Sequence, residues 1–525
     1  MDKITARDNL VKLVARFKSE FESGKTKQYT EEETKACFIT PLLTNVLGWE
    51  VSNRDEVVME QTISRGRIDY GIRVGNEFKF FVEAKQVSVD LETAIPQAVA
   101  YGYNSKVPFV VLTDFEGLKV FDANIKPVKR NLKKGLKMDI SWQDYVDRFD
   151  DIWQLAKPEV LNNSLDKLSA VKAKDRTSID KDILKDLEHW REMLAKNLFK
   201  NNKKLFDGED REKSADFLKE VTQKILDRII FIRFCEDRKL TQSQRVIDRL
   251  AGKDDLELKT YEKILEPIFR EYEGIFNSDL FAKRDWEKDL QADYKVVNAI
   301  VSETCEPYMF DVIPIEVLGN IYEQYLGHTI RLTPENVKYE EKPEVRKAGG
   351  VYYTPEYIVD YIVKNTVGKL LSELPEAKAK KIRILDPACG SGSFLIRAYE
   401  EMLKYYEGLK GKSKQKVSEG QTAMDTGSVG AKLTLEEKAG ILKEHIFGVD
   451  IDDQAVEVTK LSLMLKMLEG EWGLVKGTHL LPMLDKNIRC GNSLVSGNVL
   501  ELNKYFGEDF HKVKPFNWEE EFESI

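Results

Sequence analysis

The spacing of hydrophobic residues along the chain changes near residues 150 and 345. In the first fifty residues, apolar positions recur every three or four residues, which predicts amphipathic helices over 5–22 and 30–47. Short apolar runs rich in β-branched and aromatic residues follow, and such runs are typical of strands. They predict four strands, at residues 67–72, 78–85, 107–112 and 118–121.

The helical period returns over residues 160–345, where Leu, Lys, Glu and Asp dominate and strand signals are few. The run 227–238 is apolar on nearly all sides and contains three arginines, which predicts a central helix whose arginines pair with carboxylates. We therefore expect an all-α connector between two α/β regions. Its strongest helices are expected at residues 186–199, 214–237 and 314–325.

The last region alternates short strands with helices. A strand at 382–385 leads into a glycine-containing turn at 386–392, and a helix is expected over 393–406. A parallel α/β sheet uses this arrangement to bind a ligand at the carboxyl ends of its strands. The residues 408–433, rich in Gly, Ser, Lys and Thr, predict a flexible surface insertion. The expected fold class is α/β multidomain, with domains at 1–150, 151–345 and 346–525.

Composition places the chain among globular proteins, with 42% hydrophobic and 33% charged residues. No apolar run reaches the roughly 18–20 residues of a membrane span, and the first residues lack a signal-peptide pattern. The five cysteines are scattered without a CxxC pair, so we expect no zinc site, no disulfide framework and a cytoplasmic location. Because the net charge is −9, any DNA binding requires local basic faces or a partner's surface.

Three side chains in the first region carry candidate chemistry. Glu83 and Lys85 are two apart on a predicted strand, so both project from one face. Asp69 can reach that face from the neighbouring strand, across a hairpin turn at Gly75-Asn76. Two carboxylates, Asp69 and Glu83, form a hard oxygen site suited to Mg²⁺, which lowers the pKa of a bound water. The lysine can orient that water and neutralise developing charge.

The Asp–x13–Glu–Ala–Lys arrangement resembles the PD-(D/E)xK nucleases. The surrounding sequence is similar to the N-terminal nuclease domain of type I restriction-enzyme R subunits and of single-chain restriction–modification enzymes. The resemblance implies that Gln97 and Tyr101, on the helix after the Glu83–Lys85 strand, belong to the same site. It also implies an upstream helical glutamate, and the choice among Glu31, Glu32 and Glu33 stays open.

The densest basic run, residues 126–137, has two interpretations of equal weight. It is either a solvated loop or a phosphate-binding patch beside the nuclease site.

In the last region, the run DPACGSGSF resembles motif I of the N6-adenine DNA methyltransferases, which bind S-adenosyl-L-methionine on a Rossmann-like sheet. Residues 349–355 resemble motif X, where Thr354 can also cap a helix that starts at Pro355. Residues 445–452 and 487–494 resemble motifs II and III. The resemblance implies that Asp386 meets the methionine ammonium group, Asp450 the ribose and Asn492 the adenine. The implied cofactor-binding residues are Tyr353, Thr354, Asp386, Ala388, Gly390, Gly392, Asp450, Ile451 and Asn492.

The target-base loop of these methyltransferases, Asn/Asp-Pro-Pro-Tyr/Phe, is not found, since no two of the fifteen prolines are adjacent. We therefore expect the N-terminal part of a single-chain, type IIG-like restriction–modification enzyme that acts on double-stranded DNA. We expect it to be incompetent for methylation unless another chain supplies the loop and the target-recognition domain. The alternative is a non-catalytic cofactor-binding subunit that docks a partner carrying the recognition domain.

Overall fold

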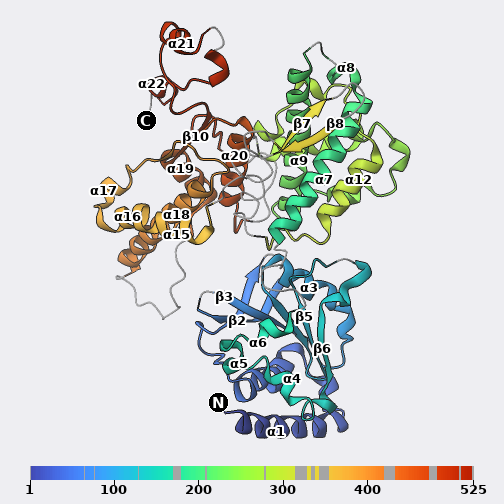
Figure 1. Ribbon diagram of the computed structural model, residues 1–525. Coiled ribbons are helices and arrows are strands. Elements are labelled where there is room, and N and C mark those ends of the chain that lie inside the picture. Colours follow the sequence, from blue (N-terminus) through green and yellow to red (C-terminus); the bar gives the residue numbers. More distant parts are fainter. Residues whose placement is uncertain are drawn as a thin grey trace. The chain divides into compact units, whose positions relative to one another are not determined.

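The protein is described by a computed structural model in which the chain forms two compact units. The first comprises residues 1–182 with 302–313, and the second comprises residues 183–301 with 314–525. Both contain helices and strands, which confirms the mixed α/β class (Figure 1). The structure describes residues 2–522 apart from 64–65, 76, 128, 170–178, 207, 209, 277–278, 314–327, 333–336, 342–353, 419–431, 472–481 and 508–509.

The first unit is built on a six-stranded sheet in the order β1-β2-β3-β4-β5-β6. The pair β3 and β4 is parallel, and every other neighbouring pair is antiparallel. The four predicted strands are β2 to β5, so the prediction is confirmed and two edge strands were missed. The strands are β1 (Val57–Ile63), β2 (Gly66–Val74), β3 (Glu77–Ala84), β4 (Phe109–Thr113), β5 (Gly117–Asp122) and β6 (Leu136–Ser141).

Helices cover both faces of this sheet. Residues of α1 (Lys3–Glu22) and of the helical segment 31–46 share one buried hydrophobic cluster with Phe80 and Val111. Residues of α3 (Ile95–Asn104) share a second cluster with Phe81 and Val110. Neighbouring strand residues therefore point to opposite faces, as a period of two requires. The helices of this unit also include α2 (Glu31–Thr34), which continues into π-helical turns at Lys35–Ile39 and Leu42–Val46, and α4 (Phe149–Trp153), α5 (Lys157–Leu161) and α6 (Ser164–Leu168).

The region between residues 179 and 305 is helical, as predicted. In α9, Arg228 pairs with Glu287 at 3.0 Å, and Arg233 pairs with Glu236 at 2.5 Å and with Asp237 at 2.8 Å. These side chains are buried, so the expected pairing of the central arginines is confirmed. The helices are α7 (Ile179–Asn201), α8 (Lys203–Phe206), α9 (Arg211–Asp237), α10 (Val246–Leu250), α11 (Glu266–Phe276) and α12 (Tyr294–Cys305).

The expectation of an all-α connector is wrong at its end. Two strands, β7 (His328–Leu332) and β8 (Val337–Glu341), form an antiparallel pair in this region. Both segments alternate apolar and polar residues, a period-two signal that the longer helical pattern around them outweighed. The predicted helix at 314–325 lies outside the described residues.

The last part of the chain contains a parallel sheet in the order β11-β10-β9. Its strands, β9 (Ile384–Asp386), β10 (Ile446–Asp450) and β11 (Ile488–Cys490), are the three that were predicted. Its helices are α15 (Glu356–Val363), α16 (Lys369–Glu373), α17 (Glu376–Ala379), α18 (Ser393–Ser418), α19 (Leu435–His445), α20 (Asp453–Met467), α21 (Val499–Phe506) and α22 (Trp518–Glu521).

Two local expectations are corrected here. Helix α18 continues past residue 406 to Ser418 through Gly408 and Gly411, because each glycine costs a helix only about 1 kcal/mol. Pro355 is the N-cap of α15 with extended backbone, so the helix begins at Glu356 and Thr354 does not cap it. Among the described helices, none has the length and apolar character needed to cross a membrane.

Candidate functional sites

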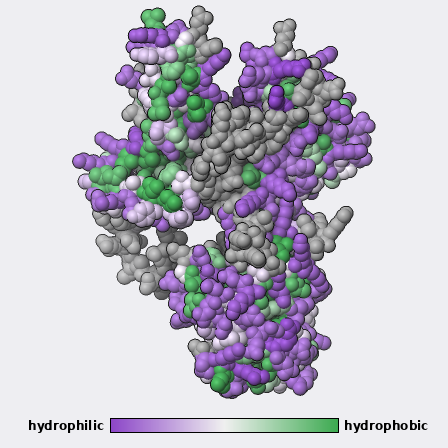
Figure 2. Space-filling view, viewed as in Figure 1, coloured by the Kyte–Doolittle hydropathy of each residue, from purple (hydrophilic) through white to green (hydrophobic). Residues whose placement is uncertain are grey.

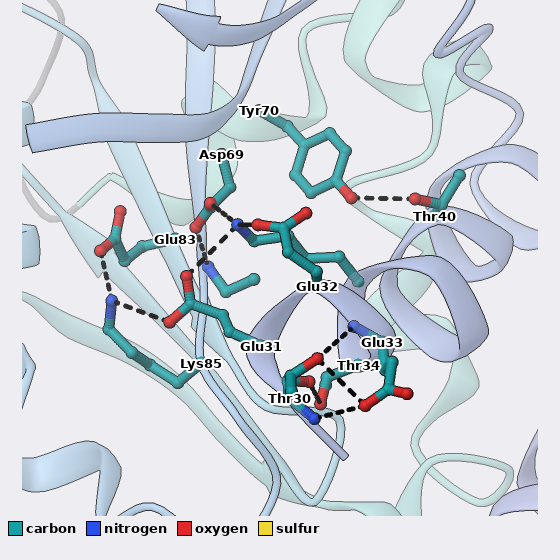
Figure 3. Close-up of polar contacts among 12 residues, drawn as sticks. Thr30, Glu31, Glu32, Glu33, Thr34, Thr40, Asp69, Tyr70, Glu83 and Lys85 are labelled. Atoms are coloured by element: carbon teal, nitrogen blue, oxygen red, sulfur yellow. Dashed lines mark hydrogen bonds and ion pairs between the residues drawn. The ribbon is translucent and has the colours of Figure 1, made fainter. Parts of the chain in front are cut away.

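The first candidate site lies where β2, β3 and the helix beginning at Glu31 meet. The Ala84 N–H donates a hydrogen bond to Oδ2 of Asp69 at 2.7 Å, which holds this carboxylate against β3 (Figure 3). Lys85 Nζ donates to Oε1 of Glu83 at 2.6 Å. The predicted residues Asp69, Glu83 and Lys85 are therefore brought to one place by the sheet.

A lysine that the sequence analysis did not single out links the two halves of this site. The Lys35 ammonium group pairs with Oδ1 of Asp69 and lies 3.2 Å from Oε1 of Glu31. The other oxygen of Glu31 is 4.0 Å from Nζ of Lys85. Acids and bases thus alternate in a row, which we call the charge row: Asp69, Lys35, Glu31, Lys85 and Glu83.

The structure distinguishes the three upstream glutamates. Glu33 accepts hydrogen bonds from the Thr30 backbone and hydroxyl, so it serves the helix cap. Glu32 lies 2.8 Å from Lys35 but is 72% exposed. Glu31 approaches both Lys35 and Lys85 and is the glutamate that enters the charge row. Lys35 follows Glu31 by one helical turn, and this spacing was the available sequence signal.

Burial and charge act against each other in this row. Burial raises the pKa of Asp69 and of Glu83, and their hydrogen bonds with Lys35 and Lys85 only partly offset it. Burial alone would lower the pKa of Lys35, but the hydrogen bonds and charge of Asp69 and Glu32 outweigh it and raise that pKa. Both acids therefore hold their negative charge less readily than exposed carboxylates do, unless more positive charge arrives.

The donor set suits a hard divalent cation. Asp69, Glu31 and Glu83 supply carboxylate oxygens, the ligands that Mg²⁺ prefers. Among the described residues, no group of three or more metal-binding side chains has the geometry of a formed metal site. The lysines stand between the carboxylates, so a cation would enter beside them and not into a ready-made cage.

The predicted helical pair is placed beside this site on α3. Gln97 is exposed, whereas Tyr101 is buried and its hydroxyl has no hydrogen-bond partner in the described part of the chain. Burial and the charges of Asp311 and Glu83 raise the pKa of this hydroxyl. Gln97 and Tyr101 also line a cavity of about 470 Å³, together with Pro307.

The basic run 126–137 has a partly structural role. Lys133 lies 2.8 Å from Glu92, and Lys126 lies over the ring of Tyr308 at 5.3 Å.

The second candidate site lies at the carboxyl ends of β9 and β10. Asp386 ends β9 and accepts a hydrogen bond from the Ala388 N–H at 3.1 Å. Asp450 ends β10 and accepts from the Gly390 N–H at 2.9 Å. Burial is the main cause that raises the pKa of Asp386, and the nearby charge of Asp450 adds to it. The two carboxylates therefore share one edge of the parallel sheet.

The glycine turn between β9 and α18 is held by its neighbours. Gly390 and Gly392 both have left-handed backbone, with φ of 52° and 86°. A Cβ on Gly392 would lie 2.8 Å from the Thr459 side chain. Thr459 in turn donates to the Gly390 carbonyl at 2.7 Å. The turn needs glycine both for its backbone and for this close approach.

The remaining cofactor candidates lie around this edge. Ile451 follows Asp450 and is 52% exposed, an apolar surface that no described residue covers. Asn492 follows β11, and its side chain accepts from the Leu494 N–H at 3.1 Å. Lys514 donates to the Ile451 carbonyl at 3.1 Å, a long-range contact that no local pattern predicts. Tyr353 lies outside the described residues.

Comparison with known proteins supplies the family. Residues 363–502 match the family model of the MmeI DNA-methyltransferase domain. Over 97% of its length, the chain is 30% identical to the type II restriction enzyme and methyltransferase RM.Eco57I of Escherichia coli. The chain is a relative of the type II restriction enzyme–methyltransferases. This confirms the resemblance that the motifs indicated. The chain spans about half the length of that relative, 51%.

Other matches are more distant. The adenine-specific methyltransferase BrxX of Escherichia coli O9:H4 (strain HS) is 26% identical over 29% of the chain and 13% of its own length. Two solved structures match at a TM-score of 0.28: a DrdV–DNA complex, at 13% identity over 92% of the chain and 40% of that protein, and the type IIG restriction endonuclease BpuSI, at 14% identity over 86% and 40%.

Proposed function

We propose that this chain acts in DNA restriction and modification, with a Mg²⁺-dependent endonuclease site in its first unit and an S-adenosyl-L-methionine site in its second. The observation that carries the nuclease half is the charge row. Its five side chains come from two strands and a helix and are held by direct ion pairs. Asp69 is buried to 5% exposure beside a backbone donor, which favours a functional carboxylate over a solvated strand end.

In this proposal, Asp69, Glu83 and Glu31 hold the cation. Mg²⁺, when bound, supplies charge for the scissile phosphate and a water of lowered pKa. Lys85 orients that water and neutralises charge on the phosphate, since among the described residues it has one short ion pair, to Glu83. Gln97, which is exposed on α3, contacts the DNA backbone next to it, and the buried Tyr101 supports the site from below. Because burial raises the pKa of both Asp69 and Glu83, the cation would also favour their ionised forms.

The methyltransferase half rests on the order of the strands. Strands β11, β10 and β9 are parallel neighbours, so Asp450 and Asp386 come to one edge, where nucleotide-binding sheets hold their ligands. In this proposal Asp386 meets the methionine ammonium group, and Asp450 the ribose hydroxyls. The exposed side chain of Ile451 packs on the adenine, and Asn492 hydrogen-bonds it. The substrate is adenine in double-stranded DNA, methylated at N6.

One experiment tests each half. A nicked-plasmid assay with Mg²⁺ should detect cleavage by the chain, and Asp69→Asn should remove it. Isothermal titration with S-adenosyl-L-methionine should detect one site per chain, which Asp450→Ala should weaken. Cleavage that persists in Asp69→Asn would remove the nuclease assignment without affecting the cofactor assignment.

A second candidate function is that of a cofactor-binding subunit that docks a partner carrying the target-base loop and the recognition domain. This docking role is favoured by exposed apolar residues on α21 and in the segment just before it. Figure 2 shows hydrophobic surface over α21. Leu494 is 93% and Leu500 82% exposed, and Val499 and Phe506 are exposed as well. Exposed apolar patches of this kind mark interaction surfaces.

Mg²⁺-dependent plasmid nicking distinguishes the two candidates, because only the first includes a nuclease. Cofactor binding without nicking supports the docking role, and nicking that Asp69→Asn removes contradicts it. Methyl-labelled S-adenosyl-L-methionine and DNA test the missing loop, since labelled DNA from the chain alone would contradict the expectation that another chain must supply it. Leu500→Glu provides a further check, since it should prevent partner binding and leave cofactor affinity unchanged.

A further inference from the structure

Lys35 is held more completely than the other lysine of the charge row. Its ammonium group has three N–H donors, and three carboxylates surround it: Asp69, Glu31 at 3.2 Å and Glu32 at 2.8 Å. Its side chain is 11% exposed. Lys85, by contrast, has Glu83 at 2.6 Å and Glu31 only at 4.0 Å. Lys35 is thus a fixed positive charge among carboxylates.

The place of this charge resembles that of a metal ion. In nucleases with two metal ions, the ions lie about 3.5–4 Å apart, which is close enough for positive charges to crowd one group of carboxylates. Asp69 is the buried carboxylate at the centre of this site, and both of its oxygens already accept a donor. Oδ2 accepts from the Ala84 N–H, and Oδ1 pairs with Lys35. A second ion held by Asp69 would have to displace an ammonium group that has three partners.

The net charge of the cluster also indicates one divalent cation and not two. Four carboxylates surround the two lysines: Asp69, Glu31, Glu32 and Glu83. When all six groups are ionised, the net charge of the cluster is −2. One divalent cation neutralises that charge, whereas two would leave the cluster at +2 in a partly buried place, which is costly.

We propose that the Lys35 ammonium group takes the place of a second divalent cation, so that the nuclease site of this chain binds one metal ion and not two. Lys35 is a positioning residue, since it holds Asp69 and Glu31 for the ion that does bind. The proposal rests on the proposed nuclease function and adds the number of ions to it.

The test counts Mn²⁺ ions bound per intact chain, by measuring free Mn²⁺ with electron paramagnetic resonance. The wild type should bind one ion that Asp69→Asn loses. Lys35→Met keeps the length of the side chain and removes its charge, so it should bind two. Lys35→Arg restores the charge and should return the count to one.

A matched control is available in the same unit. Lys119 is 12% exposed and also lies between two carboxylates, Glu92 at 3.3 Å and Asp139 at 2.7 Å. Lys119→Met should leave the count at one. Two ions in the wild type would overturn the proposal, and so would a folded Lys35→Met that still binds one. A wild type that binds no Mn²⁺ would remove the nuclease function as well, so the two failures can be told apart. The wild-type count needs no variant to fold.

Discussion

The two candidate sites are organised in different ways. The charge row of the first unit is held by side chains that neutralise one another across a helix and two strands. The strand-end site of the second unit is held by the backbone, since N–H groups of its own loops donate to Asp386 and Asp450. A site made of ion pairs depends on each partner, whereas a backbone-held site depends on the path of its turns.

The largest effect is expected on nicking activity, when a side chain of the charge row is removed. Lys85→Ala should reduce Mg²⁺-dependent nicking by about 100-fold or more, because it removes the charge that faces the phosphate. Lys79→Ala on the same strand, whose partner Glu77 is exposed, should leave nicking unchanged. Equal nicking by wild type and Lys85→Ala would point to a different active site.

A buried acid of the first unit tests its electrostatics without any ligand. Burial raises the pKa of Asp114 to about 6. A carboxyl with a raised folded-state pKa contributes stability below its unfolded pKa, near 3.8, and this contribution is lost as pH rises through 6. The stability of wild type relative to Asp114→Asn should therefore fall by up to about 3 kcal/mol between pH 4 and pH 7, measured by urea unfolding. A flat difference would show that Asp114 ionises normally.

Substitution in the strand-end site should change the affinity for S-adenosyl-L-methionine. Asp450→Ala should weaken S-adenosyl-L-methionine binding by about 10- to 100-fold, since a charged hydrogen-bond partner contributes roughly 1.5–3 kcal/mol. Glu376→Gln, an exposed acid of α17 paired with Lys380, is the control and should leave the affinity unchanged. An Asp450→Ala variant with wild-type affinity would place the cofactor elsewhere.

The smallest effect concerns the turn itself. Gly392→Ala should destabilise the second unit by about 1–2 kcal/mol, because its left-handed backbone and the Thr459 side chain both oppose a Cβ. Gly440→Ala, in α19, should instead be neutral or stabilising, because no atom of the described residues lies within 4 Å of the added carbon. Denaturant unfolding of the two variants gives the comparison, which fails if both change stability alike.

The two sites were also unequally predictable from the sequence. The positions of Glu83, Lys85, Asp386 and Asp450 followed from strand periods and strand ends, which are local properties. Lys35 was missed because its role is a contact between a helix and a strand far apart in the chain. The choice of Glu31 among three adjacent glutamates likewise needed the direction in which each side chain points.

The fold errors have similar causes. The hairpin of β7 and β8 was lost within a longer helical pattern, and α18 was ended too early at its glycines. In both places a short local signal competed with a longer one, and the contacts that decide the outcome are not local.

Calorimetric melting of the intact chain tests the central claim, that two separate sites reside in the two units. Mg²⁺ should raise the melting temperature of one transition, and S-adenosyl-L-methionine that of another, because each ligand stabilises the unit it binds. Asp69→Asn should abolish only the Mg²⁺ shift, and Asp450→Ala only the cofactor shift. A variant that loses both shifts would contradict the account, and so would a variant that keeps the shift of the ligand whose site it alters.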